Sequence, residues 1–311
     1  MTISDYIETF YDTPIFNIKD GQPIHADKKY AYRIHCEYED KHSAQQYLDS
    51  LLAAVPNDKI EVIVLGAWEE SYEQSPQNFI DKLIASQDKL TNLKALFIGD
   101  MTYEDCEISW INQGSYQALL RAYPQLEALT IRGSTELDFE PVEHNHLKQL
   151  CIQSGGLPFD ITQNIAQSDL PALEHLELWL GDDNYGFCGE PSQYKDALNT
   201  IAKKSPKLRY LGVKNSMIAD KLALILSKEE WITQLETLDL SMSTLGDEGA
   251  QALLESPYIP KLKNLNLEYH FITEAMMEKM RTLPIEVNLA DQQEEEDYGD
   301  EDAHRYVSVS E

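Results

Sequence analysis

A cysteine and a histidine are the first residues in this sequence that could do chemistry together. Cys151 and His175 each lie in a repeated apolar phrase, and a thiol activated by an imidazole is a known type of nucleophile. If the two phrases form neighbouring strands, Cys151 lies beside Glu177, and His175 lies diagonally at roughly 7–8 Å. That distance is too long for a hydrogen bond, and the carboxylate of Glu177 disfavours a thiolate. We therefore predict no catalytic pair, and Cys151 is interpreted as a small residue on a strand.

Metal and nucleotide sites are equally weak in this sequence. His144 and His146 precede a strand, but no cysteine or third ligand follows at the spacing of a zinc site. Acidic turns such as Asp182-Asp183-Asn184 lack the alternating oxygen ligands of a calcium loop, so we interpret them as solvated turns. Gly246-Asp247-Glu248-Gly249 lacks the lysine of a phosphate-binding loop. We predict no metal, no cofactor and no enzymatic activity.

The elements that position these side chains are repeats of one phrase, Leu-x-x-Leu-x-Leu, in which Ile or Val can replace Leu. Each copy holds a short strand whose inward side chains are buried only by stacking on neighbouring copies. The intervals between copies run from 21 to 35 residues, in or slightly above the range of leucine-rich repeats. The central apolar residues of the copies are Ile63, Leu96, Leu129, Leu150, Leu176, Leu211, Leu238, Leu265 and a weaker Val287.

Amphipathic runs between the phrases predict helices. They cover residues 76–90, 193–201, 218–226, 246–254 and 272–280. The alternation predicts an α/β leucine-rich-repeat solenoid, a right-handed β-α superhelix in the form of a curved horseshoe. Parallel strands then line its concave face and helices its convex face. The asparagine usual after each strand is replaced, for example by Ser216 and Ser243, so Ser hydroxyls, water or main chain must bond the backbone there.

The sequence divides into three parts. Residues 1–59 lack the phrase and form a predicted N-terminal capping region, with a strand-like run at 30–38 and a helix-like run at 43–55. Residues 60–290 are an array of about nine repeats. Residues 291–311 form an acidic tail that we expect to be flexible.

The last residues of the tail differ from its acidic part. Residues 291–302 contain eight acidic side chains and no basic one, whereas the following segment contains Arg305, Tyr306, Val307, Ser308 and Val309. Such a segment could dock as an added strand or peptide. Two alternatives stand beside each other, a frayed terminus and a short linear segment presented on a flexible acidic spacer.

The side chains between the apolar positions of each phrase face the concave side. In the first two repeats they include Val62, Val64 and Phe97, whose exposure would cost about 25 cal/mol per Å². We expect the N-terminal region or a partner to cover them. Later repeats place aromatic and charged residues there, a mixture typical of interface hot spots. The predicted binding residues are Arg132, Cys151, His175, Glu177, Trp179, Tyr210, Lys214 and Asp239; the alternative is ordinary polar decoration of a sheet.

Charge and cysteine usage limit the partners. The chain has 25 basic and 54 acidic residues, a formal net charge of −29, which repels nucleic acids and anionic membranes. The acidity either keeps the protein soluble or attracts a basic partner. The four cysteines show no close pairing, no export signal is present, and no apolar run approaches a membrane span. We therefore predict a cytoplasmic protein without nucleic acid or membrane partners.

Several phrases resemble those of an uncharacterised family of bacterial cytoplasmic leucine-rich-repeat proteins. They are Ser154-Gly155-Gly156-Leu157, the Leu-Glu-His-Leu-Glu-Leu-Trp-Leu-Gly run at 173–181, and the ending Arg305-Tyr306-Val307. The resemblance covers nearly the whole chain and implies the leucine-rich horseshoe, with no established activity. It also implies genes near those of ATP-grasp and radical-SAM enzymes, which favours a scaffold or a substrate in a modification pathway.

Two functions follow. The first is a non-enzymatic scaffold that binds a protein or peptide on the concave face. The second is a substrate or carrier protein whose tail, residues 306–311, is presented to modifying enzymes of a natural-product or peptide-modification pathway. The sequence does not indicate an oligomeric state.

Overall fold

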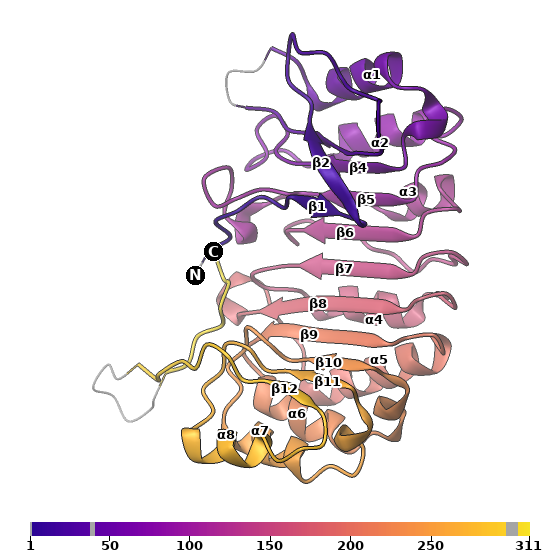
Figure 1. The fold of residues 1–311 in the computed structure, drawn as a ribbon. Helices are drawn as coiled ribbons and strands as arrows, with labels where there is room; N and C mark the ends of the chain where they lie inside the picture. Colours follow the sequence, from indigo (N-terminus) through magenta and orange to yellow (C-terminus); the bar gives the residue numbers. More distant parts are fainter. Residues whose placement is uncertain (1, 38–40, 297–303) are drawn as a thin grey trace. The chain divides into compact units, whose positions relative to one another are not determined.

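The protein consists of two compact units in a computed structural model that describes residues 2–37, 41–296 and 304–311. The N-terminal unit comprises Thr2–Gln153, Ser168–Ala172 and Glu311. The C-terminal unit comprises Ser154–Gln167 and Leu173–Ser310. Both units repeat one pattern, in which a short parallel strand is followed by a helix or an irregular crossover (Figure 1). This pattern is the predicted α/β leucine-rich-repeat solenoid fold.

The sheet of the N-terminal unit follows chain order. Strands β2 to β7 pair in parallel with their neighbours, and β1 pairs with β2 in antiparallel fashion. The strands are β1 (Thr9–Phe10), β2 (Thr13–Asn17), β3 (Ala31–Ile34), β4 (Val62–Leu65), β5 (Ala95–Ile98), β6 (Ala128–Arg132) and β7 (Gln149–Gln153). The helices are α1 (Ala44–Ala54), α2 (Gln77–Ala85) and α3 (Gln117–Ala122), with short 3-10 turns at Asn57–Lys59 and Ile108–Trp110.

The C-terminal unit has the same order of parallel strands, β8 to β12. The strands are β8 (His175–Gly181), β9 (Tyr210–Ser216), β10 (Thr237–Asp239), β11 (Asn264–Asn266) and β12 (Glu286–Asn288). The helices are α4 (Phe159–Gln167), α5 (Pro191–Lys204), α6 (Ala219–Leu226), α7 (Asp247–Leu254) and α8 (Glu274–Met280). Three 3-10 turns lie at Asp183–Tyr185, Glu230–Gln234 and Ile259–Lys261.

Register explains why the apolar phrase repeats. Ile63 pairs with Leu96, and Leu96 pairs with Leu129, so equivalent residues form a continuous column inside the N-terminal unit. All three are fully buried. Helices complete this core from one face of the sheet, since α2 buries Phe79 and Leu83. One repeat alone has no neighbour on which to bury its column, so the array folds cooperatively.

Local sequence signals predicted most of the helices. The structure contains α1, α2 and α5 to α8 within the predicted runs or extending them by one to three residues. Helix α1 begins where Ser43 and Gln46 form a reciprocal capping box. Helix α2 ends at Ala85, earlier than the predicted run, because residues 86–89 form a turn. Helices α3 and α4 and strands β1 and β2 were not predicted.

The N-terminal segment covers the apolar side chains of the first repeats. Val62, Val64 and Phe97 lie on the sheet face opposite the helices, which we call the open face, and they are buried. Ile7, Phe10, Tyr11 and Ile15 pack against them. Figure 1 shows β1 crossing in front of this part of the sheet. Of the two expected covers, the N-terminal region and a partner, the structure shows the N-terminal region.

The strand-end turns are bonded without an asparagine ladder. Ser243 Oγ accepts the backbone N–H of Ser216 at 3.0 Å and donates to the carbonyl of Ser241 at 2.9 Å. In the next repeat His270 takes this role, and its Nδ1 accepts the N–H of Ile272 at 3.1 Å. Serine hydroxyls and an imidazole therefore bond the backbone where the usual asparagine would.

Candidate functional site

Six of the predicted binding residues lie together on the open face of the C-terminal unit. Strand β8 contributes His175, Glu177 and Trp179 at alternate positions, which places their side chains on one face. Residue pairing sets His175 beside Tyr210, Trp179 beside Lys214, and Gly212 of β9 between Glu177 and Asp239. We call these six residues the β8–β10 cluster: His175, Glu177, Trp179, Tyr210, Lys214 and Asp239.

The Tyr210 hydroxyl joins the two carboxylates of the cluster. It donates to Asp239 Oδ2 at 2.7 Å, and the same oxygen lies 3.1 Å from Glu177 Oε2. Burial and the two carboxylates raise the pKa of Tyr210 far above its ordinary value, so the phenol keeps its proton. A Cβ at Gly212 would lie 3.0 Å from the Tyr210 ring, so this glycine makes room for the ring to lie along the strand. The arrangement is therefore encoded locally by the Tyr-x-Gly order of β9.

Glu177 is held in its charged form by its neighbours. Trp179 Nε1 donates to Glu177 Oε1 at 2.7 Å, and Lys214 Nζ lies 3.7 Å from the same oxygen. Burial alone would raise the pKa of Glu177, but His175, Lys214 and Trp179 together lower it to about 2. Lys214 also lies 3.8 Å from Asp239 Oδ2 and 5.6 Å from the centre of the Trp179 ring.

Accessibility differs within the cluster. The His175 ring stacks on the Tyr210 ring at 3.9 Å with an interplanar angle of 3°, and the His175 side chain is 34% exposed. Trp179 is buried, at 8% exposure. His175 is therefore the more accessible side chain of the pair it forms with Glu177, while Lys214 and Glu177 are 15% and 13% exposed. The expectation of Trp179 as an exposed contact residue does not fit this burial.

Amide side chains continue the polar surface toward β12. Asn266 Nδ2 donates to Asp239 Oδ2 at 2.9 Å, and Asn288 Nδ2 donates to Asn266 Oδ1 at 2.9 Å and to Glu268 Oε2 at 3.1 Å. At the alternate positions of β8 to β12 that lie on the open face, extended to Glu268 two residues after Asn266, four carboxylates oppose the single ammonium of Lys214; they are Glu177, Asp239, Glu268 and Glu286. The open face of this unit is therefore acidic and already hydrogen-bonded in one arrangement.

Arg132 lies elsewhere, in a buried network of the N-terminal unit. Its Nη1 donates to the carbonyl of Met101 at 2.7 Å, and its Nε donates to Gln153 Oε1 at 2.7 Å. Its guanidinium lies over the Phe97 ring at 5.1 Å. Burial lowers the pKa of Arg132, whereas Asp100 raises it. Since the side chain is only 5% exposed, Arg132 is not a contact residue of an open surface, and the predicted site is corrected in this respect.

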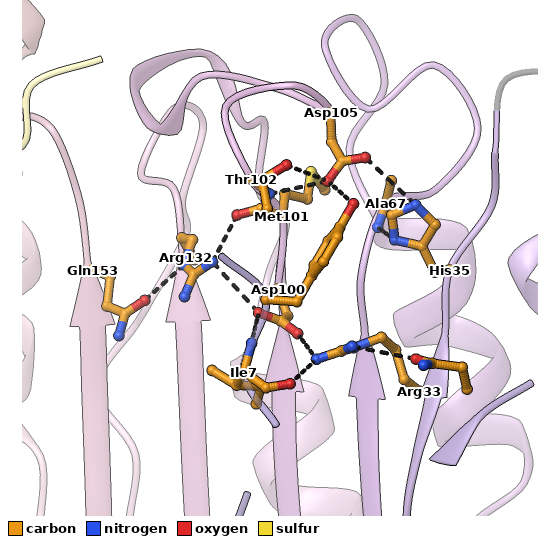
Figure 2. Close-up of polar contacts among 12 residues, drawn as sticks. Ile7, Arg33, His35, Ala67, Asp100, Met101, Thr102, Asp105, Arg132 and Gln153 are labelled. Carbon is orange, nitrogen blue, oxygen red and sulfur yellow. Dashed lines mark hydrogen bonds and ion pairs between the residues drawn. The ribbon is translucent and has the colours of Figure 1, made fainter. Parts of the chain in front are cut away.

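Asp100 lies between two buried arginines (Figure 2). Its carboxylate pairs with Arg33 and lies 3.5 Å from Arg132 Nη1. The same groups clamp the N-terminal segment, because Asp100 Oδ1 accepts the N–H of Ile7 at 3.4 Å and Arg33 donates to the carbonyl of Ile7. Nearby, Asp105 accepts the Tyr6 hydroxyl at 2.7 Å, and burial together with this bond raises the pKa of Tyr6 to about 12. The network is structural, because it holds in place the N-terminal segment that covers the first repeats.

Cys151 is half-buried on β7 of the N-terminal unit, where it pairs with Thr130. The distance predicted between Cys151 and His175 concerns residues of two different units, so it stays a prediction. None of the four cysteines, all within the described residues, forms a disulfide, and burial raises the pKa of Cys106 to about 11. Among the described residues no group of three His, Cys, Asp or Glu side chains could hold a metal ion.

The N-terminal unit contains a polar cavity of about 410 Å³ that was not predicted from the sequence. Tyr6, Asn17, Arg33, His35 and Tyr47 are among the residues that line it. These residues come from four separate segments without a shared motif. Only the pairing of β2 with β3 and the position of the N-terminal segment bring them together, so no local signal could have found the cavity.

The end of the tail is bound to the C-terminal unit. Arg305 Nη1 donates to Asp220 Oδ2 at 3.1 Å, and Val307 and Val309 are buried, at 3% and 5% exposure. The described end of the tail is therefore docked, as the possibility of an added strand or peptide suggested, and is neither of the two alternatives, a frayed terminus or a presented segment. Flexibility was predicted for residues 291–311, of which residues 297–303 lie outside the described residues.

Comparisons with known proteins support the fold. No protein-family model matches the chain, and no curated protein matches it. A crystal structure of a protein from Bacteroides fragilis, a Northeast Structural Genomics Consortium target, aligns with a TM-score of 0.80 and 29% identity over 86% of this chain and 76% of that one. The TLR13–ssRNA13 complex aligns with a TM-score of 0.38 (14% identity, 78% and 33% coverage). An internalin from Listeria monocytogenes aligns with a TM-score of 0.30 (15% identity, 75% and 73% coverage). No functional argument is based on the last two structures, because their TM-scores are 0.38 and 0.30.

In the part of the chain that the structure describes, no helix combines the length and apolar character needed to cross a membrane.

Proposed function

We propose that this chain is a non-enzymatic binding scaffold that holds a basic protein or peptide segment on the open face of its C-terminal unit. The observation that carries the proposal is the β8–β10 cluster. Glu177, Asp239, Tyr210 and Lys214 are fixed in one arrangement by mutual contacts, on a face where His175 remains accessible. Preorganised groups lose little conformational freedom on binding, which favours affinity.

The charge of this face sets the chemistry of the partner. Four carboxylates oppose one ammonium, so a guanidinium or ammonium gains electrostatic energy there and a phosphate loses it. The net charge of −29 acts in the same direction over longer distances. A basic peptide is therefore the proposed ligand, and nucleic acids and anionic membranes are not.

The other parts of the chain have supporting roles in this proposal. Residues 1–59 act as a cap, residues 60–290 as the repeat array and residues 291–311 as an acidic tail. We place the protein in the bacterial cytoplasm, in the uncharacterised family that its Ser-Gly-Gly-Leu and Trp-Leu-Gly phrases resemble. The 29% identity with the protein from Bacteroides fragilis supports this placement. A carrier role for the tail is not proposed, since Val307 and Val309 are buried.

The test is a fluorescence titration with a labelled dodecapeptide of alternating Arg and Ser, and with a Glu-Ser peptide of the same length. We expect saturable binding of the Arg peptide only. Glu177→Gln removes one carboxylate of the cluster and should weaken binding about tenfold. The matched control is Glu236→Gln, which removes a half-exposed carboxylate outside the cluster. Equal weakening by both substitutions would mean that only net charge matters, and the proposed site would be rejected.

A further inference from the structure

The C-terminal segment crosses the carboxyl ends of several repeats in the C-terminal unit. Figure 1 shows this segment, in yellow, running past the ends of the strands of that unit. We call the surface beneath it the rim groove. It is formed by Asn215, Asp220, Met242, Gly246, Tyr269 and Phe271.

Three successive repeats contact the segment from the same position of the repeat phrase. Asn215, Met242 and Tyr269 each follow the last apolar residue of their phrase by two and have left-handed φ values of 51°, 63° and 61°. Tyr269 donates its hydroxyl to the Tyr306 carbonyl at 3.2 Å, and the Met242 carbonyl accepts the N–H of Ser308 at 2.9 Å. The Asn215 side chain bonds both main-chain groups of Val309.

These hydrogen bonds go to the main chain of an extended segment, as they do in many peptide-binding proteins. An amide side chain that bonds both the N–H and the C=O of one residue recognises any peptide in that conformation. In the N-terminal unit, the first left-handed residues after β5 and β6 are Gly99 and Gly133. These two repeats therefore lack the side-chain contacts that Asn215 and Tyr269 make in the rim groove.

Side chains add sequence selectivity. Val307 and Val309 flank Ser308, and both valines are buried, whereas Ser308 contacts the groove through its backbone N–H. Arg305 lies between Asp220 Oδ2 at 3.1 Å, the Thr244 carbonyl at 3.3 Å and the Phe271 ring at 5.7 Å. A Cβ at Gly246 would lie 2.2 Å from Arg305 Nη1, so the glycine leaves the space that the guanidinium fills.

We propose that the rim groove is a peptide-recognition site for an extended partner segment of the pattern Arg-x-Val-x-Val. The chain's own residues 305–309 occupy the groove as an internal competitor. The bound segment forms no strand of the sheet, so its departure leaves the repeat core intact. This site is distinct from the β8–β10 cluster and does not rest on the function proposed for it.

An internal competitor acts at an effective concentration on the order of millimolar. An external peptide of the same sequence must therefore bind the wild-type protein much more weakly than a protein whose own segment has left the groove. This difference separates an exchangeable site from a permanent structural contact.

The experiment measures fluorescence anisotropy of a labelled peptide corresponding to residues 304–311. It uses the full chain as wild type and as the release variant Val307→Asp/Val309→Asp, with Arg305→Ala as an independent release variant. Circular dichroism verifies the fold of each protein. We expect a Kd at least tenfold lower for either release variant than for wild type.

Peptide substitutions keep the protein constant and locate the contacts. A peptide with Val307→Asp or Val309→Asp should lose binding to the release variant, whereas Ser308→Ala should bind like the parent peptide. In the release background, Gly246→Ala should weaken the parent peptide about tenfold. It should leave a peptide carrying Arg305→Ala nearly unchanged, because the methyl group takes the space of the guanidinium.

Three outcomes would overturn the proposal. The first is the absence of saturable binding to both release variants. The second is equal affinity of wild type and release variants. The third is a dimer in analytical ultracentrifugation that wild type forms and the release variants do not, since this would assign the groove to a second copy of the chain rather than to a partner.

Discussion

At the scale of single residues, the charges of this protein have two different uses. Asp100 lies between Arg33 and Arg132 with no exposed surface, and it fixes the N-terminal segment through Ile7. Glu177 is a partly accessible carboxylate beside Lys214 and His175. The first kind of charge is buried and structural, and the second belongs to the surface proposed to bind a ligand.

The Asp100 network predicts a large loss of stability on neutralisation. Asp100→Asn leaves two buried guanidinium groups without their shared counter-charge, which costs about 3–5 kcal/mol. Urea unfolding of both proteins measures this difference, and Glu236→Gln, which changes a half-exposed carboxylate, should cost less than about 0.5 kcal/mol. A stable Asp100→Asn protein would show that the arginines have other counter-charges.

The low pKa of Glu177 predicts acid sensitivity. Its pKa is about 2 in the folded protein and near 4.5 when unfolded, so its charged form contributes stability above about pH 4.5. That contribution is lost as the pH falls from 4.5 toward 2. Wild type should therefore exceed Glu177→Gln in unfolding free energy at pH 7, with a difference that shrinks through this window.

Urea titrations of both proteins between pH 7 and pH 3 test this expectation. The full effect is on the order of 3 kcal/mol, from about 1.4 kcal/mol for each unit of pKa. A difference that stays constant over the whole range would mean that Glu177 has an ordinary pKa.

At the scale of elements, the strand β1 and the segment before it are part of the core of the N-terminal unit. Phe10 lies 5.6 Å from the Phe97 ring, and it packs with Ile7 and Ile15 on Val62 and its neighbours. The antiparallel pair β1 and β2, with the segment before it, thereby covers apolar side chains that would otherwise be exposed to solvent or need a protein partner.

This packing predicts that Phe10→Ala lowers the free energy of unfolding by about 1–3 kcal/mol. The loss is smaller than for a Phe→Ala substitution at a fully buried position, because Phe10 is half-buried. Dye binding should rise as Val62, Val64 and Phe97 become exposed. Tyr72→Ala is the matched control, since Tyr72 is a half-exposed aromatic residue outside this core. If Phe10→Ala had no more effect than Tyr72→Ala, the segment would not be a working cover.

The strand-end turns also lead to a prediction. Ser243→Ala leaves the buried N–H of Ser216 without its acceptor, which costs about 1–3 kcal/mol. Chemical unfolding measures the loss. Ser50→Ala is a control, because Ser50 is exposed and its hydroxyl bonds the Gln46 carbonyl one turn earlier in its own helix. Equal stability of the two variants would contradict a role for Ser243 in place of the usual asparagine.

The sequence predicts the elements that repeat and misses those that occur once. The Leu-x-x-Leu-x-Leu phrase predicted β4 to β12 because each copy carries its own local pattern, as the column Ile63, Leu96 and Leu129 shows. The alternation of residues placed Glu177, Tyr210 and Lys214 on one face. It could not show that Arg132 is buried, because its partners Asp100 and Phe97 come from a different repeat.

The docked segment illustrates the same limit. Arg305, Val307 and Val309 were recognised as unlike the acidic run before them, but their contacts come from Asn215, Met242 and Tyr269. Their shared position, two residues after the last apolar residue of each phrase, is visible in the sequence once the repeats are aligned. The left-handed backbone at that position is not encoded by residue type, since asparagine, methionine and tyrosine all occupy it.

At the scale of the whole molecule, the two units differ in how their open faces are used. The N-terminal unit covers its apolar open face with its own first residues. The C-terminal unit has an acidic open face with accessible side chains, in a chain whose net charge is −29. The central claim is therefore that a basic peptide binds over β8 to β10.

Hydrogen exchange of the full chain with and without the alternating Arg-Ser peptide tests this claim most directly. The claim predicts slower exchange in peptides that cover residues 175–181 and 210–216, and no change in those covering residues 62–65 and 95–98. Protection confined to acidic segments elsewhere, such as residues 69–73 or 291–296, would contradict it.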